Sequence, residues 1–236
     1  MEEARIEKKY DARKWKKIMD TTQSNYANMI KRLSTKQKVS NFVLIYYSIF
    51  LIINTLTGKY FPQYFNLSLA EYFGVILSVV MLAYSLINNS SNYSVRIANI
   101  EESLNELKTI KRKLSDDNLQ QCIDDYNDIT DNTERREDID FFITVKHLCK
   151  EFEINWFTKK HKNKRENIVK DDEKEVYDNQ EKVVNGYISE INVLTEQGKL
   201  VCSTIWNIIL FVVPILIFAL CVITSTKGAE LLEFVL

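Results

Sequence analysis

Cysteine and histidine side chains are the first place to look for metal binding or nucleophilic chemistry in this sequence. The six residues are Cys122, Cys149, Cys202, Cys221, His147 and His161. No two cysteines form a C-x-x-C pair, and the histidines do not complete a zinc or iron–sulfur spacing. We therefore expect no metal and no other cofactor. Cys202 and Cys221 are interpreted as small apolar residues, and the other two as thiols in a reducing compartment.

Enzymatic chemistry has no clear sequence basis. The chain lacks a nucleophile motif, a Walker-type loop and a glycine-rich dinucleotide turn. Its 32 acidic residues lie in helical stretches balanced by 31 basic ones, which is typical of solvated helix faces. The sequence therefore predicts a protein that is not an enzyme. The net charge of −1 also gives no support for direct nucleic-acid binding.

Three uncharged apolar stretches dominate the chain, at about residues 41–58, 72–88 and 200–226. Each approaches or exceeds the roughly 20 residues that a helix needs to cross a hydrocarbon core about 30 Å thick. The first two are separated by only about a dozen residues, which predicts a transmembrane helical hairpin; a buried hairpin in a soluble protein is the alternative. Pro214 lies within the third stretch, where a kink is plausible because neighbouring helices tolerate proline in membranes.

Small and polar uncharged residues enter the first two apolar stretches. They are Ser48, Asn54, Gly74, Ser78 and Ser85. Such residues usually mark helix–helix contacts in membranes, but they can also line a wet pore when several copies assemble. The sequence leaves both interpretations open. No ionisable residue that would indicate a proton relay or coupled transporter lies within the stretches.

The distribution of basic residues predicts the topology. Lysines and arginines precede the first stretch and follow the second, whereas the intervening loop carries Lys59 alone. We expect a cytoplasmic amphipathic helix over 1–38, a transmembrane hairpin over 39–89, a cytoplasmic helical domain over 90–199, a third transmembrane helix over 200–226 and a short external tail over 227–236. The N-terminus would be cytoplasmic and the C-terminus periplasmic. The first apolar helix is expected to serve as the targeting signal. With 5 Gly and 2 Pro in the whole chain, the predicted fold class is an all-α integral membrane protein.

Two further features lie in the predicted cytoplasmic domain. Apolar residues recur in steps of three and four along a candidate oligomer seam, which comprises Ile97, Ile100, Leu104, Leu107 and Leu114. This heptad-like pattern predicts a coiled-coil-like continuation of the second membrane helix, and packing within one small domain is the alternative. A basic cluster follows aromatic residues and consists of Lys159, Lys160, Lys162, Lys164 and Arg165. It is a candidate site for anionic lipid or a phosphate-bearing ligand, and otherwise a solvated loop.

Three segments carry a resemblance to a known family: RLSTKQKVSNFVLIYYSIF, SVVMLAYSLINNSSNYSVRIANIEESLNELKTIKRKL, and YNDITDNTERREDIDFF at 126–142. In these segments and in the order of its parts, the chain resembles the SLATT family, two-transmembrane effectors associated with SMODS and SLOG proteins in bacterial defence operons. The resemblance covers about residues 5–155 and leaves the third apolar stretch outside. An Asn-His pair is common in related members where this chain has Asn132-Thr133.

The resemblance implies a membrane effector of antiphage defence that forms a pore or disrupts the inner membrane, leading to abortive infection, when a linked sensor is triggered. The expected partners are the lipid bilayer, further copies of the chain, and either a defence-operon sensor protein or a nucleotide second messenger. The alternative function is a non-catalytic membrane anchor or scaffold that docks a cytoplasmic partner. A lipid- or peptide-processing membrane enzyme lacks candidate residues.

Overall fold

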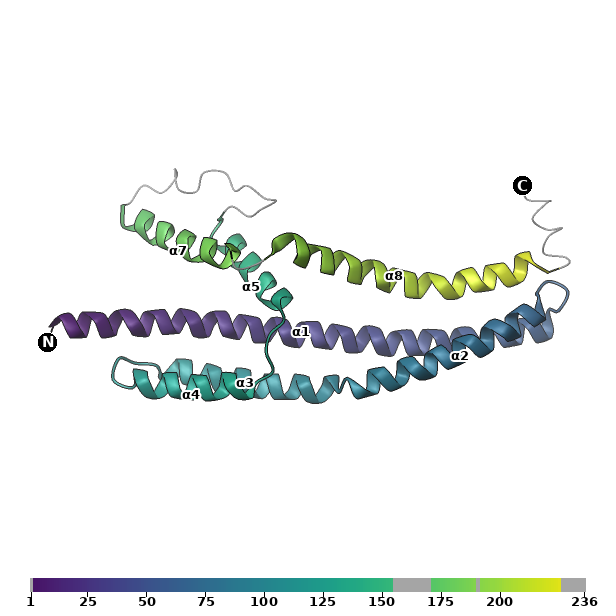
Figure 1. Cartoon of the computed structure of the whole chain (residues 1–236), viewed down its shortest axis with the longest axis horizontal. Coiled ribbons are helices and arrows are strands. Elements are labelled where there is room, and N and C mark those ends of the chain that lie inside the picture. The colour runs from purple at the N-terminus through teal and green to yellow at the C-terminus, as the bar shows by residue number, and fades with distance from the viewer. Residues whose placement is uncertain (1, 155–170, 190–191, 226–236) are drawn as a thin grey trace. The chain divides into compact units, whose positions relative to one another are not determined.

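The computed structural model describes residues 2–154, 171–189 and 192–225, and these ranges contain helices and no strand. The helices are α1 (Glu2–Tyr60), α2 (Leu67–Ser90), α3 (Tyr93–Lys113), α4 (Leu119–Asn132), α5 (Asp138–Glu151), α7 (Asp171–Ser189) and α8 (Val193–Ile223) (Figure 1). Three helical stretches are long and apolar enough to cross a membrane. The predicted all-helical fold with three such stretches is therefore confirmed. The basic cluster at 159–165 and the tail at 227–236 lie outside the described residues.

The chain divides into two compact units, and each unit is discontinuous in sequence. The polar unit comprises Met1–Ser34 and Ser94–Lys199, and the apolar unit comprises Thr35–Tyr93 and Leu200–Leu236. Helices α1 and α8 contribute residues to both units. The apolar unit holds the three apolar stretches, and the polar unit holds α3, α4, α5 and α7.

The first helix is longer than the sequence pattern predicts. The amphipathic segment over 1–38 and the first apolar stretch form one helix of 59 residues, without a break near residue 38. The reason is local: the first glycine of the chain is Gly58 and the first proline is Pro62, so nothing earlier interrupts the helix. α1 ends at Tyr60, shortly before that proline.

The second apolar helix does not continue uninterrupted into the seam. α2 ends at Ser90 and α3 begins at Tyr93, and Asn92 between them has a φ of 46°. Asparagine tolerates this left-handed conformation better than most residues. The hydroxyls of Ser90 and Ser91 both donate to the carbonyl of Ile87, which satisfies the helix end.

Helix boundaries in the polar unit follow local capping chemistry. The residues SDDN at 115–118 predict a helix end. α3 ends at Lys113, and the side-chain amide of Asn118 donates to the Lys113 carbonyl over 2.8 Å, so this prediction is correct. The spacing of apolar residues predicts a helix over 134–153, and the observed helix α5 begins at Asp138. There Glu137 and Asp140 form a capping box that fixes the first turn of α5.

The polar unit has its own core, built largely from α5 and α7. Its buried members are Ile139, Phe141, Phe142, Val145, Cys149, Ile154 and Val184. In the candidate oligomer seam, Ile100 is 1% exposed and Leu107 is fully buried, while Ile97, Leu104 and Leu114 are partly buried. The centre of the seam is therefore covered within a single chain. Homo-oligomerisation, and the part of this seam that stays partly exposed as its contact, remain predictions.

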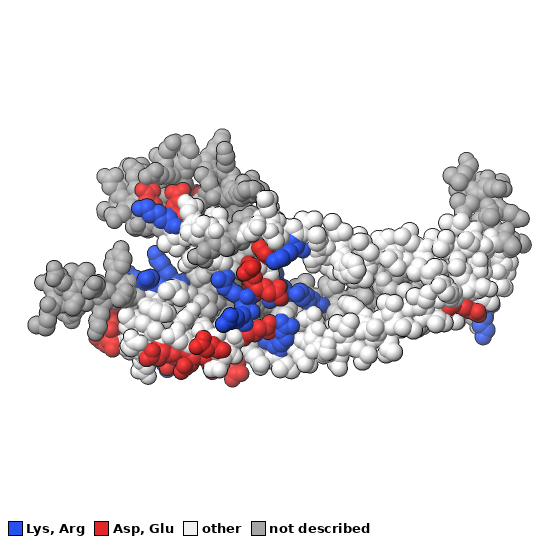
Figure 2. All heavy atoms as spheres, viewed as in Figure 1, with Lys and Arg blue, Asp and Glu red and all other residues white. Residues whose placement is uncertain are grey.

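The apolar unit exposes large apolar side chains on all three of its helices. Examples are Phe42, Ile45, Ile49, Ile52, Val75, Val79, Leu82, Leu86, Trp206, Ile208, Leu216 and Leu220. Figure 2 shows the charged residues gathered over the part of the chain that carries α3, α4 and α5, and few over α2 and the second half of α8. Such an outward apolar surface is unfavourable in water and suits a hydrocarbon solvent.

Candidate functional site

The apolar unit is held together by an aromatic cluster between α1, α2 and α8. Val43, Tyr47 and Phe50 of α1 are buried against Leu77 of α2. Several partly buried residues of α8 pack on this cluster, among them Leu210, Phe211 and Phe218. The ring centroids of Tyr46 and Phe211 are 5.6 Å apart. Dispersion and packing of this kind are what hold helices together when lipid surrounds them.

Two tyrosine hydroxyls of α1 donate to backbone carbonyls of α8. Tyr47 Oη donates to the Leu210 carbonyl and Tyr46 Oη to the Phe211 carbonyl, both over 2.9 Å. Leu210 precedes Pro214 by four residues, and proline has no N–H to donate to that carbonyl within the helix. The Tyr47 hydroxyl thus replaces the hydrogen bond that Pro214 removes. An unpaired carbonyl at this depth would cost free energy because no water is present to satisfy it.

The hairpin has a second buried polar contact. Asn54 is 2% exposed, and its Nδ2 donates to the carbonyl of Ala70 in α2 over 3.2 Å. The loop after α1 is in turn fixed to α8, since the backbone N–H of Asn66 donates to the Cys221 carbonyl over 2.9 Å. The Asn66 side chain also caps α2 by accepting from the Leu69 N–H. Asn54 therefore serves helix–helix packing within the chain.

The other small and polar candidates of the apolar stretches lie differently from Asn54. Ser48, Ser78 and Ser85 are exposed on the single chain, and Gly74 is partly exposed, with open space where a Cβ would lie. The hydroxyls of Ser48 and Ser78 donate to carbonyls of their own helices, at Leu44 and Gly74. These two bonds are local to one helical turn and join no two helices. The three serines are therefore left open to a neighbouring chain.

The central polar contact of the polar unit joins α1 to α5. The guanidinium of Arg32 holds the carboxylate of Asp140 in a fork, with Nε–Oδ1 at 2.9 Å and Nη2–Oδ2 at 3.0 Å. The Asp140 side chain is fully buried, and that of Arg32 is 11% exposed. Arg32 Nη1 also contacts Glu137. Planar forks of this type are the strongest ion-pair geometry that arginine offers.

Further polar residues continue this contact along one face of α1. The Thr144 hydroxyl of α5 lies 2.8 Å from Asn25 Oδ1 and accepts from Asn28 Nδ2 over 2.9 Å. One turn earlier, Thr22 hydrogen-bonds the Tyr126 hydroxyl of α4. The sequence segment at 126–142 also reaches α3, since Glu134 pairs with Arg96. The segment that supports the family resemblance therefore packs α4 and α5 onto α1 and α3.

Thr133 follows α4 and joins it to α3. Its hydroxyl contacts Ser103 Oγ of α3 over 2.8 Å and the carbonyl of Ile129 over 2.6 Å. Sequence reasoning treated Arg32 only as a topology signal and did not single out Asp140, Tyr46 or Tyr47. Two sequence signals point to them. Asp140 is an acidic residue between the apolar residues of DIDFF, and Pro214 leaves a carbonyl of its helix in need of another donor.

The thiols of the polar unit are poorly suited to nucleophilic or metal chemistry. Burial raises the pKa of Cys149 to about 11 and also raises the pKa of Cys122, so both are protonated near neutral pH. In the described part of the chain, no three His, Cys, Asp or Glu residues gather as metal ligands. The polar contacts between α1 and α5 serve to join these helices.

The chain belongs to a family of membrane effectors. Residues 7–224 match the SMODS and SLOG-associating 2TM effector domain family 5, one of the SLATT families. Membership implies a two-transmembrane effector of defence systems. The match extends through the third apolar helix, so the expected limit near residue 155 was too short. No curated protein and no solved structure matches this chain.

The Tyr47 contact predicts a specific interaction with Pro214. Tyr47→Phe leaves the Leu210 carbonyl unpaired and should destabilise the protein by about 1 kcal/mol, in the range of hydrogen bonds inside membranes. In a Pro214→Ala background, where residue 214 regains an N–H, the same change should cost little. Reversible denaturant unfolding in detergent measures both effects as a double-mutant cycle. Equal costs in the two backgrounds would show that Tyr47 does not compensate for the proline.

The buried Arg32–Asp140 pair predicts a larger loss of stability on mutation than the more exposed Arg96–Glu134 pair. Asp140→Ala leaves a buried guanidinium without its carboxylate and removes the α5 cap, so about 3–5 kcal/mol should be lost. Arg96→Gln, which breaks the more exposed pair with Glu134, is the matched control and should cost under about 1 kcal/mol. Thermal unfolding of the purified full chain compares them. Similar melting temperatures for the two variants would contradict the central role of Asp140.

Proposed function

We propose that this protein permeabilises the bacterial inner membrane as an oligomeric, non-catalytic effector when a trigger acts on its polar unit. The observation that carries the proposal is the continuity between the two units: α1 and α8 have residues in both, and only Ser91 and Asn92 separate α2 from α3. The polar unit is thus connected by continuous helix to the apolar parts of α1 and α8, and by a two-residue link to α2. Membership in a family of membrane effectors supports the same role.

An oligomer is proposed because of where the polar residues of the apolar helices lie. Ser48, Ser78 and Ser85 are exposed on the single chain, whereas Asn54 is used within it. A water path lined by these serines would therefore need several copies of the chain around it. The trigger is proposed to be a defence-operon sensor protein or a nucleotide second messenger. It acts on the chain in the cytoplasm.

The discontinuity of the polar unit supports the proposed topology. Residues 1–34 and 94–199 pack into one unit, which supports a topology with both on the same side of the membrane. The residues between them then cross it an even number of times, as a hairpin does. The excess of lysine and arginine assigns that side to the cytoplasm. A single crossing by α8 leaves the C-terminus in the periplasm.

A scaffold that docks a partner without opening the membrane is the second candidate function. One observation favours it: α4 exposes four aspartates, at positions 124, 125, 128 and 131, and contains no lysine or arginine. A basic partner surface would suit that face. Permeabilisation under induced expression separates the two functions, because a scaffold alone leaves the membrane potential unchanged.

The proposed topology predicts the accessibility of two reporter positions. A reporter fused after Leu236 should be active in the periplasm, and one inserted beside Lys162 should be active in the cytoplasm. Alkaline phosphatase and green fluorescent protein fusions report the two compartments. A cytoplasmic C-terminus would mean that α8 does not cross and would reduce the protein to two spans.

The proposed pore predicts the effect of bulk at the exposed serines. Replacing Ser78 and Ser85 together with leucine should abolish depolarisation on induced expression, because apolar side chains dewet a narrow path. Replacing both with alanine is the control and should retain most of the response, since it adds no bulk. A potential-sensitive dye measures depolarisation, and a native gel measures assembly. A dissociated leucine variant would instead assign these serines to helix packing, and an intact, fully active one would exclude them from the path.

A further inference from the structure

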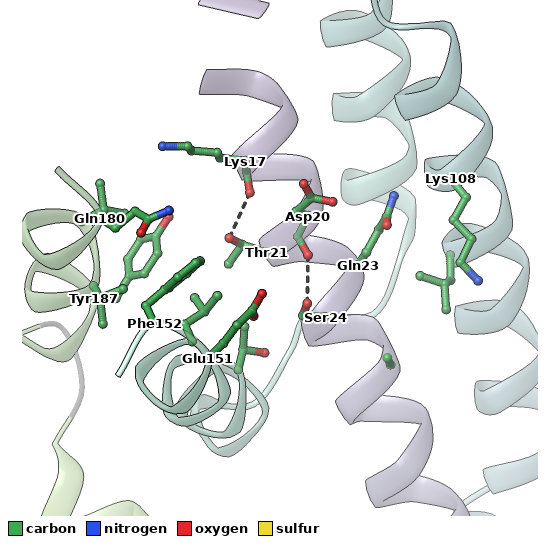
Figure 3. A pocket seen from close by; sticks show the side chains of 16 residues that line it. Lys17, Asp20, Thr21, Gln23, Ser24, Lys108, Glu151, Phe152, Gln180 and Tyr187 are labelled. Atoms are coloured by element: carbon green, nitrogen blue, oxygen red, sulfur yellow. Dashed lines mark hydrogen bonds between the residues drawn. The ribbon is translucent and has the colours of Figure 1, made fainter. Parts of the chain in front are cut away.

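A cavity of about 520 Å³ lies within the polar unit, between α1, α3, α5 and α7 (Figure 3). This volume falls in the range of small-molecule sites, which is about 300–1,000 Å³. All sixteen lining residues belong to the polar unit. None of them takes part in the proposed water path, so the cavity is a feature that the effector role does not explain.

One end of the cavity has aromatic and aliphatic walls. Figure 3 shows the rings of Phe152 and Tyr187 approaching α1 from α5 and α7, with Gln180 beside Tyr187. Tyr187 is held in place by an edge contact with Phe141, whose centroid is 5.4 Å away. Leu148 and Val184 complete this wall. Flat apolar surfaces fixed in this way favour a planar ligand, since aromatic rings stack or meet edge to face.

Hydrogen-bond donors of α1 and α3 also line the cavity; Figure 3 shows Gln23 between α1 and α3 and Lys17 extending toward Gln180. Gln23 Nε2 is buried and has no hydrogen-bond partner among the described residues, which is costly for an amide donor. Lys17 and Lys108 also line the cavity, and neither forms an ion pair with an acid in the described part of the chain. In contrast, the Thr21 and Ser24 hydroxyls already donate to carbonyls of α1.

The charges around the cavity leave a positive excess. Asp20 is paired with Lys111, a residue that does not line the cavity. The charged residues that remain in the described lining are Lys17, Lys108 and Glu151, which is an excess of one positive charge. An anionic ligand would balance this excess, and its acceptor oxygens would satisfy the unpaired amide of Gln23.

We propose that this cavity binds a small aromatic anion, with its rings against Phe152 and Tyr187 and its anionic group toward Gln23 and Lys108. The inference goes beyond membrane permeabilisation. Ligand binding is measured without any membrane activity, so the binding proposal and the permeabilisation proposal can each fail while the other holds.

The test uses the full chain in nanodiscs of zwitterionic phosphatidylcholine, with naphthalene-2-sulfonate as the probe and empty nanodiscs as the blank. Ligand-detected NMR should show saturable binding above the blank. Lys108→Gln should weaken it several-fold, whereas Lys113→Gln, an exposed lysine of α3 outside the cavity, should leave it unchanged. The neutral naphthalene-2-sulfonamide should bind less tightly than the sulfonate, and inorganic sulfate should not compete at equal concentration.

Gln23→Met provides the second arm, because methionine keeps the size of the side chain and removes the donor. Binding should fall about fivefold to tenfold, as for one lost hydrogen bond. The ligand-free variant should melt at a higher temperature than the wild type, since an unpaired buried donor has gone. Binding no higher than the blank, equal binding of the sulfonamide, or full binding by Lys108→Gln would each overturn the proposal. The Lys108 result decides the case if Gln23→Met does not fold.

Discussion

The fork between Arg32 and Asp140 is the contact on which the polar unit depends. Removing both charges from water is expensive, so the pair adds little net stability by itself. What it provides is position: the planar guanidinium accepts one orientation of the carboxylate, and that carboxylate also caps the first turn of α5. One turn further along α5, this orientation brings Thr144 within hydrogen-bond distance of Asn25 and Asn28. Apolar packing of Phe142 and Val145 completes an arrangement that the polar groups specify.

In the apolar unit, packing of apolar side chains is the rule and each polar group needs a partner. Its surroundings supply no water, so the free energy of a polar group depends on finding a partner inside the protein. Pro214 removes one backbone hydrogen bond within α8, and the hydroxyl of Tyr47 in α1 supplies a substitute donor. Pro214 is buried, and the Leu210 carbonyl that it leaves without an intrahelical donor accepts from Tyr47. α8 therefore has a point at which it can bend while its hydrogen bonds stay complete. Such a point is a natural place for a helix to change shape in a membrane.

The sequence predicted the helices better than it predicted their contacts. Apolar stretches, helix stops at residues 115–118 and the all-helical class follow from composition and local chemistry, and the family was recognised from the order of these parts. The periodicity of the seam predicts that Ile100 and Leu107 are buried, but it cannot say whether the same chain or another chain covers them. The Tyr47–Leu210 contact joins residues 163 positions apart, and Arg32 and Asp140 are separated by 108. Pairings of that range depend on the folded arrangement of helices, which no local pattern encodes.

The discontinuous polar unit has a consequence for the order of events during synthesis. Arg32 leaves the ribosome 108 residues before Asp140, a delay of roughly 5–20 s at ordinary translation rates. In the proposed topology the hairpin is inserted during this interval, before α5 exists to meet α1. The polar unit can therefore close only after the chain has returned to the cytoplasm. Membrane insertion thus precedes completion of the unit proposed to receive the trigger, so a newly made chain is anchored before it can respond.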